Sequence, residues 1–147
     1  MTDYLALFRT RLLHAEALVE LARDQRTLAA AGDYDRLLDS LQRKQRIIDR
    51  MTAADASASA GEPSLRDRWN RDCPALPDAV RQECEMLLDR CEQHLDETLD
   101  HEREAIATVT AARSAVNDQL HNLTAGRQTQ AGYTPPASPK SLLDAAG

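Results

Sequence analysis

The sequence contains very few aromatic residues. Tyr, Phe and Trp together make up 3% of the 147 residues, although hydrophobic residues as a whole reach 42%. Most apolar side chains are therefore Leu and Ala, which are typical of long helical seams and less so of a thick globular core. A chain of 147 residues has the length of one domain.

Long hydrophobic runs are also absent. No stretch approaches the roughly 18 consecutive apolar residues of a membrane-spanning helix, and charged residues make up 29% of the chain. The first residues, MTDY, lack the basic and then apolar pattern of a secretory signal. We therefore expect a soluble, cytoplasmic protein that does not insert into membranes.

Cysteine is scarce, and its odd count argues against a disulfide framework. Cys73, Cys84 and Cys91 are predicted to be reduced, partly buried thiols. Cys91 lies near His94 and His101, but zinc sites usually draw their ligands from two short-spaced pairs, and no second pair exists here. The Glu-x-x-His motif of di-metal helical bundles does not occur. We expect no metal site.

Glycine occurs five times and proline six times, and none of them lies in 1–31, 33–60 or 78–125. Their scarcity excludes the glycine-rich loops that bind phosphates or dinucleotides, and no nucleophile-elbow motif is present. We therefore predict that the protein is not an enzyme and needs no cofactor. The same scarcity leaves three stretches in which nothing interrupts a helix.

These stretches carry apolar residues at alternating spacings of three and four. The pattern predicts helices over about 3–31, 33–55 and 77–124, with a short helix near 65–71. Residues 126–147 are small, polar and rich in proline, which predicts a flexible tail. The expected organisation is a single all-helical domain over 1–125, followed by this tail.

The break between the first two helices is only one or two residues long. Gly32 has the properties of a helix C-cap and Asp33 those of the next N-cap. An antiparallel hairpin is favoured over one kinked rod because it buries both apolar stripes, with Leu41 in the core. The predicted fold class is all-α: this hairpin and one long C-terminal helix form an elongated three-helix bundle or coiled coil, with a disordered C-terminal tail.

Acidic residues outnumber basic ones, and they are unevenly placed. The net charge of −6 argues against nucleic-acid binding, which needs a basic surface. Residues 1–52 carry nine basic and eight acidic residues, whereas 77–124 carry four and eleven. A row of acids four residues apart, from Glu92 to Glu104, is either a solvated face or the partner of basic residues on the second helix.

The late part of the last helix carries the candidate binding site. At 1.5 Å per residue, 77–124 span roughly 70 Å, which is longer than either preceding helix. Part of the apolar stripe therefore needs another partner, and an amphipathic helix is the kind of partner that such a face binds. A homodimer through the same stripe, or packing against residues 1–31, stays open. The candidate partner-binding residues are Ile106, Val109, Val116, Leu120 and Leu123.

Two stretches resemble a known family. The run Leu28-x3-Gly32-Asp33-x3-Leu37-x3-Leu41-x2-Lys44-Gln45-x2-Ile48 is similar to the central stretch of FlgN-like flagellar export chaperones. The run Leu120-x2-Leu123-x2-Gly126, followed by Tyr133, resembles the C-terminal end of that family. The resemblance covers about 10–52 and 85–133, which is most of the chain.

The resemblance implies a bacterial cytosolic chaperone of type III flagellar export. Such chaperones bind the C-terminal helical segments of hook–filament junction proteins and bring them to the export gate. Val116, Leu120 and Leu123 would contact this client, and Tyr133 would dock at the gate. Tyr133 is followed by Thr134, where the family commonly has glycine.

Two other functions stay open. One is a structural or adaptor coiled coil that self-associates through its long amphipathic helix. The other is the related export chaperone that serves the filament cap and also acts as a regulator.

Overall fold

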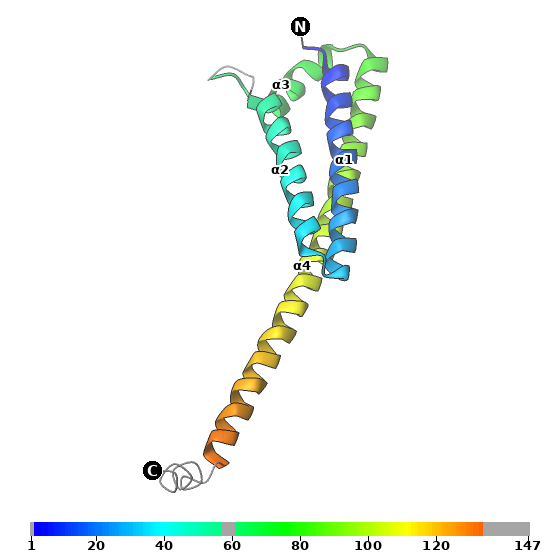
Figure 1. The fold of residues 1–147 in the computed structure, drawn as a ribbon. Coiled ribbons are helices and arrows are strands. Elements are labelled where there is room, and N and C mark those ends of the chain that lie inside the picture. The colour runs from blue at the N-terminus through cyan, green and yellow to red at the C-terminus, as the bar shows by residue number, and fades with distance from the viewer. Residues whose placement is uncertain (1, 57–60, 134–147) are drawn as a thin grey trace, which may run out of the picture. The chain divides into compact units, whose positions relative to one another are not determined.

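The computed structural model describes residues 2–56 and 61–133, and every regular element within these residues is helical. The elements are α1 (Tyr4–Ala31), α2 (Tyr34–Ala56), α3 (Leu65–Asp72), the 3-10 turn η1 (Cys73–Ala75) and α4 (Asp78–Tyr133) (Figure 1). The predicted all-α class is confirmed. The chain consists of two compact units, of which unit 1 ends at Thr108 and unit 2 begins at Val109.

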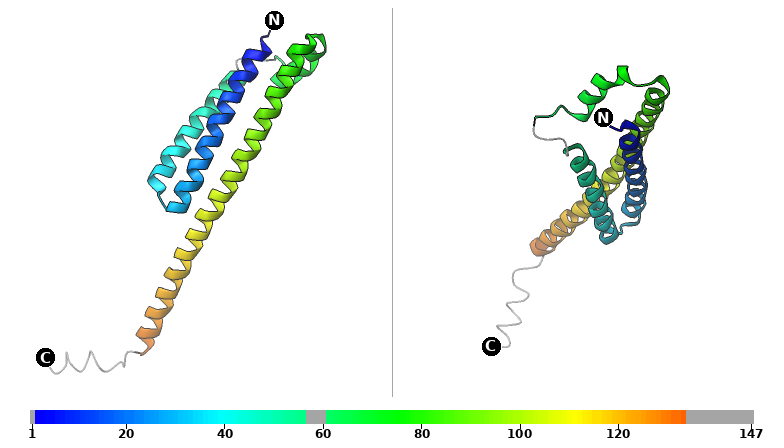
Figure 2. Two further views of the ribbon diagram at one scale, coloured as in Figure 1. Left: turned by 90° about the vertical axis from the view of Figure 1, so that its right-hand side faces the viewer. Right: turned by 90° about the horizontal axis from the view of Figure 1, so that it is seen from above.

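A two-residue turn at Gly32 and Asp33 joins α1 to α2. Gly32 has a φ of 69°, a left-handed conformation that glycine adopts readily because it has no Cβ. Its N–H donates to the Ala29 carbonyl, and the Asp33 N–H donates to the Leu28 carbonyl, so the end of α1 is capped. The Asp33 carboxylate accepts from the Arg36 N–H at 3.3 Å and opens α2. The predicted hairpin is therefore confirmed, with α2 folded back along α1 (Figure 2).

Ion pairs between α1 and α4 show how these two helices run in unit 1. The pairs are Arg9 with Glu83 at 2.5 Å, Glu16 with Arg90 at 3.6 Å, and Arg23 with Glu97 at 2.5 Å. The partners are 74 residues apart in each pair, so the two helices are parallel and in constant register. We call these three pairs the ion-pair ladder. Its seven-residue repeat is that of a coiled coil, in which such pairs select register and orientation.

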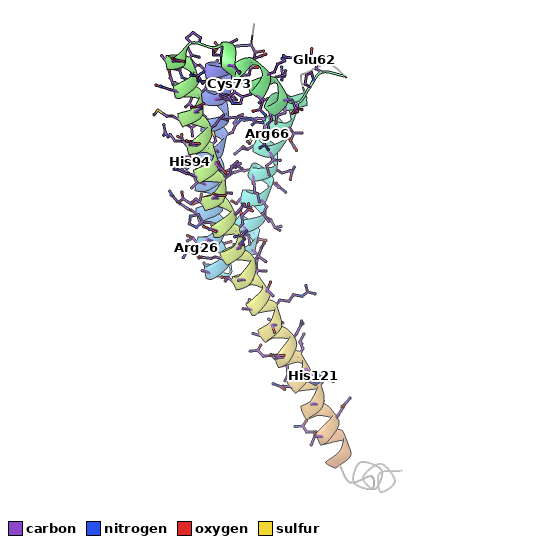
Figure 3. All side chains as sticks on the ribbon, turned by 180° about the vertical axis from the view of Figure 1, so that it is seen from behind. Arg26, Glu62, Arg66, Cys73, His94 and His121 are labelled. Atoms are coloured by element: carbon purple, nitrogen blue, oxygen red, sulfur yellow. The ribbon has the colours of Figure 1, made fainter. Side chains whose placement is uncertain are left out.

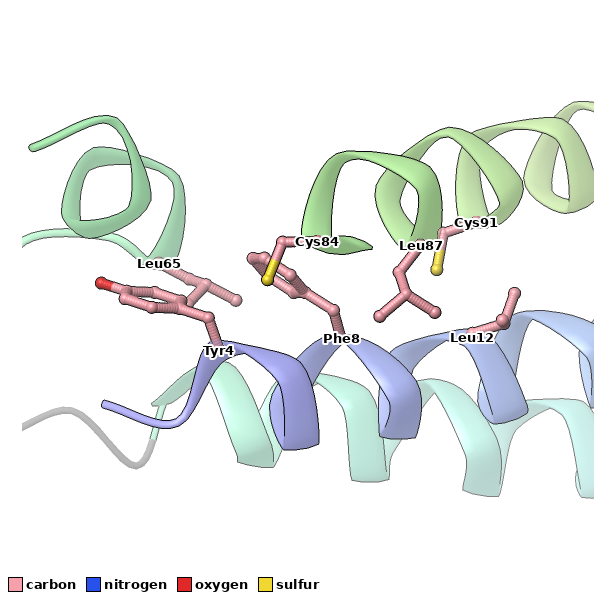
Figure 4. Close-up of a cluster of buried hydrophobic side chains, with 7 residues drawn as sticks. All are labelled: Tyr4, Phe8, Leu12, Leu65, Cys84, Leu87 and Cys91. Carbon is pink, nitrogen blue, oxygen red and sulfur yellow. The ribbon is translucent and has the colours of Figure 1, made fainter. Parts of the chain in front are cut away.

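The apolar core of unit 1 lies where α1, α3 and the start of α4 meet (Figure 4). Phe8 and Cys84 are fully buried. The Trp69 ring packs edge-on against Tyr4 and Phe8, with centroid distances of 5.2 and 5.1 Å. The Tyr4 hydroxyl donates to Asp72 Oδ2 at 2.6 Å and ties α1 to α3. The other buried members are Leu12, Leu65, Leu87 and Cys91.

The second helix contributes much less to the core than predicted. None of the described apolar side chains of α2 is buried, and Leu41, expected in the core, is 41% exposed. The residue that α2 buries most is Ser40, at 6% exposed. The prediction for Leu41 is wrong because α2 turns the neighbouring face, centred on Ser40, toward the bundle. The apolar stripe of α2 is therefore only partly covered.

Two polar side chains lie buried within the hairpin. Gln25 of α1 is 3% exposed, and Ser40 of α2 is 6% exposed. Each lies seven residues from the turn, Gln25 before Gly32 and Ser40 after Asp33, so the antiparallel arrangement places them at one level. Among the described residues, Gln25 Nε2 and Ser40 Oγ have no hydrogen-bond partner. Because an unsatisfied buried polar group costs roughly 1–3 kcal/mol, this level weakens the hairpin.

The last helix is longer than predicted. The structure extends α4 to Tyr133, whereas the sequence predicts an end at residue 124 and a flexible tail from 126. Gly126 lies inside this helix, and a Cβ there would meet nothing within 4 Å. A glycine in a helix interior destabilises the helix by only roughly 0.5–1 kcal/mol relative to alanine. A single glycine therefore does not end a helix when the residues on both sides of it are helical. The rest of the predicted tail, 134–147, lies outside the described residues.

Candidate helix-binding surfaces

Unit 2 presents an apolar stripe along its part of α4. Val109, Val116, Leu120 and Leu123 recur at spacings of seven, four and three residues, so they share one face of the helix. Val116, Leu120 and Leu123 are 53, 57 and 62% exposed, and we call these three residues the α4 stripe. All described side chains from 113 to 130 are exposed (Figure 3, where His121 is labelled). The described part of unit 2 therefore contains nothing that covers this face.

The remaining predicted site residues lie in different surroundings. Ile106 belongs to unit 1 and is 64% exposed, whereas Val109 at the start of unit 2 is half-buried. Tyr133 is the last residue of α4, and its side chain lies outside the described residues. The docking role of Tyr133 stays a prediction, while Val116, Leu120 and Leu123 have the exposure that a binding residue needs.

A second exposed apolar surface lies on unit 1, where α2 and α4 run in opposite directions. An ion pair between Lys44 and Glu102 joins the two helices. On each helix, the apolar residues three, four or seven positions away share the face of the ion-paired residue. The exposed members are Leu41 at 41%, Leu95 at 38%, Leu99 at 47% and Ile106 at 64%, and we call these four residues the α2–α4 seam.

Sequence reasoning missed this seam. Leu95 and Leu99 follow the same periodic stripe as the buried Leu87 and Cys91, so periodicity alone assigns them to the core. The signal that distinguishes them is on the facing helix. There Ser40 and Lys44 occupy the positions where a closely packed partner helix would carry apolar residues.

The acidic row of α4 does not pair with α2 in the way that one hypothesis required. Asp100 pairs with Arg103 of its own helix, and Glu104 pairs with Arg26 of α1. Among the described residues, Glu92 forms no ion pair. The row is therefore divided between other partners and solvent. Four exposed acids without an ion pair in the described part of the chain recur at spacings of four, three and four beside the seam, and we call them the acidic edge: Glu85, Asp89, Glu92 and Asp96.

An open hollow of about 460 Å³ adjoins the core of unit 1. Its apolar walls come from Phe8, Trp69 and Leu88, and the ion pair between Arg11 and Asp55 borders it at 2.5 Å. Its volume suits a large apolar side chain or a small ligand. Ser64 also lines the hollow, where its hydroxyl donates to the Asp67 carboxylate at 2.7 Å and accepts from the Asp67 N–H as the N-cap of α3.

The cysteines are free thiols, as the sequence predicts. Burial raises the pKa of the Cys84 and Cys91 thiols, which lowers their thiolate content and their reactivity. Within the part of the chain that the structure describes, no cluster of three or more His, Cys, Asp or Glu side chains could hold a metal ion. None of the helices among these same residues is long and apolar enough to span a membrane.

The fold and its surfaces define an all-helical bundle protein with uncovered apolar helix faces in both units. Comparison with protein-family models, with curated proteins and with solved structures finds no match for this chain. The chemistry of the exposed faces is therefore the basis for a functional proposal.

Proposed function

We propose that this protein is a cytoplasmic flagellar export chaperone that binds C-terminal helical segments of hook–filament junction proteins and delivers them to the type III export gate. One observation carries the binding step: the α4 stripe is more than half exposed along a helix whose described side chains from 113 to 130 are all open to solvent. The choice of client and gate rests on the resemblance to FlgN-like chaperones in the stretches around Gly32 and Leu120.

Burial of the stripe supplies a useful but moderate binding energy. Burying a leucine or valine side chain completely contributes roughly 1.5–3 kcal/mol, and somewhat more than half of each stripe side chain is still available. Three such residues therefore contribute roughly 3–5 kcal/mol before the cost of ordering the client is subtracted. The stripe alone therefore supports only a complex in the millimolar range or weaker, and the apolar face of the client has to add a similar contribution. A moderate total of this kind allows release of the client by exchange, which an export chaperone needs.

A calorimetric titration tests this proposal. The probes are synthetic peptides of the C-terminal helical segments of hook–filament junction proteins from the same genome. We expect saturable binding near one-to-one with a negative heat-capacity change, because apolar surface is buried. Leu120→Asp with Leu123→Asp should abolish binding and leave the far-ultraviolet circular dichroism close to that of the wild type.

The matched control places the same two charges on the opposite side of the helix. Asn122 and Ala125 are both exposed, and Asn122→Asp with Ala125→Asp should preserve binding. Equal loss in both double variants would show a general charge effect and count against the stripe. Failure of every junction-protein peptide, together with binding of the segment from the filament cap protein, would instead favour the related cap chaperone.

The alternative function is a structural adaptor that self-associates through α4. The spacing of Val109, Val116, Leu120 and Leu123 favours it, because the same heptad pattern lines the seams of coiled coils. Light scattering at several protein concentrations separates the two functions. A tight dimer that none of the client peptides dissociates would favour the adaptor.

A further inference from the structure

We propose that, in the absence of a client, the α4 stripe of one copy docks on the α2–α4 seam of a second copy. This inference uses the stripe on which the proposed function rests, but it does not depend on what the client is. The partner copy covers two surfaces that a single copy leaves exposed.

The apolar residues of the two surfaces match in spacing. Along α4, Leu95 and Leu99 are four residues apart, as are Val116 and Leu120. When the stripe lies antiparallel to the seam, Leu120 meets Leu95 and Val116 meets Leu99. All four side chains are between 38 and 57% exposed in the single copy. Docking removes both sets from water at once, and Leu41 adds apolar contact from α2.

The charges match in the same alignment. Arg127 then faces Leu88, with Glu85 three residues before that leucine and Glu92 four residues after it, where Glu92 also lies opposite Leu123. Arg127 and these two acids are exposed and form no ion pair within the described residues. The pairing therefore places an unpartnered guanidinium between two unpartnered carboxylates of the acidic edge.

Two simple forms of the alternative pairing, stripe against stripe, bring like charges together. Arg113 and Arg127 lie seven residues on either side of Leu120. If two stripes pair antiparallel about Leu120, Arg113 of one copy faces Arg127 of the other. If they pair in parallel, each arginine faces the same arginine of the other copy. Neither arrangement covers Leu95 or Leu99. Stripe-to-seam docking avoids both penalties. When two copies exchange stripes reciprocally, the same contact forms twice, and the assembly closes as a dimer.

Light scattering after size-exclusion chromatography tests the docking in the full chain. The wild type should give twice the chain mass of 16.3 kDa. Leu120→Asp with Leu123→Asp removes the stripe, and Leu95→Asp with Leu99→Asp removes the seam. Each double variant should weaken the dimer by about a hundredfold or more, as expected for buried anchor residues. Circular dichroism checks that both variants remain helical.

Mixing the two double variants gives a sharper result. The first retains an intact seam and the second an intact stripe, so one of the two contacts can form between them. An equimolar mixture should therefore dimerise more tightly than either variant alone. Three results would overturn the inference: a monomeric wild type, a dimer that the seam variant leaves intact, or a mixture that does not regain association.

Charge exchange tests the register without disturbing apolar packing. Arg127→Glu alone, or Glu85→Arg with Glu92→Arg, should weaken the dimer about three- to tenfold, and the combination of all three changes should restore it. Arg66→Glu, at an exposed arginine of α3 with no ion pair in the described residues, is the matched control and should have no effect. A combined variant that stays weak refutes the antiparallel pairing. A failed client titration alongside an intact dimer would refute the proposed function and leave this inference standing.

Discussion

Replacement of the buried Gln25 by leucine should stabilise unit 1. Gln25 is 3% exposed, and its Nε2 has no hydrogen-bond partner among the described residues. The unsatisfied amide costs roughly 1–3 kcal/mol, and a leucine of similar size removes this cost while adding apolar contact. Imperfect packing of the new leucine side chain reduces this stabilisation by up to about 1.5 kcal/mol. We therefore expect Gln25→Leu to raise the free energy of unfolding by about 1–2 kcal/mol.

Urea unfolding measures this change, followed both by circular dichroism at 222 nm and by the fluorescence of Trp69, the only tryptophan of the chain. The midpoint should rise while the slope of the transition stays the same. Gln93→Leu, at an exposed glutamine of α4, is the matched control and should change stability by no more than about 0.5 kcal/mol. A destabilised or unchanged Gln25→Leu variant would show that the buried amide has a partner in solution, and the reasoning would fail.

Three further changes probe other parts of the molecule. Phe8→Ala should lower the free energy of urea unfolding by about 3–5 kcal/mol, because Phe8 is 1% exposed and central to the core; a loss below about 1 kcal/mol would contradict this packing. Gly126→Ala should stabilise the local helix by roughly 0.5–1 kcal/mol, seen as higher thermal stability of the 222 nm signal with an unchanged Trp69 transition; a loss of helicity would place Gly126 at a helix end. The hydrogen bond and ion pair with Arg23 lower the pKa of Glu97. The contribution of the ionised Glu97 carboxylate to folding stability is therefore complete above the ordinary glutamate pKa of about 4.3 and is lost as the pH falls below it. Glu97→Gln should therefore show a smaller loss of stability below about pH 4.3 in acid titrations than the wild type, and identical acid profiles would rule out this contribution.

Local signals made much of the fold predictable. Gly32 and Asp33 fix the hairpin turn because one supplies the left-handed residue and the other the N-cap acceptor. The predicted short helix near 65–71 carries the large side chain of Trp69, which packs against Tyr4 and Phe8 of α1. These features depend on residues close together in sequence or on the few large side chains available.

Features set by the relation between helices could not be predicted in the same way. The apolar pattern of α2 is compatible with two adjacent faces, and only packing on α1 shows that Ser40 is buried and Leu41 is exposed. The predicted end of α4 is too early because the sequence analysis treats Gly126 as the end of the helix, although one glycine destabilises a helix only slightly. Long-range register and small energy differences therefore set the limit of the sequence analysis.

The same distinction, between features of one helix and features of helix packing, applies to the candidate surfaces. The exposure of Val116, Leu120 and Leu123 follows from the excess length of α4, which the sequence already showed. The exposure of Leu95 and Leu99 depends on how closely α2 approaches α4, and no periodicity within α4 carries that information.

The ion-pair ladder constrains how the length of this protein can change in evolution. One residue inserted between Arg9 and Arg23 would turn the following part of α1 by about 100° and break both the ladder and the core. Seven residues removed from α1 and seven from the facing part of α4 would leave one common offset in all the remaining pairs. Related chains of different length should therefore differ by whole heptads, gained or lost in both helices together.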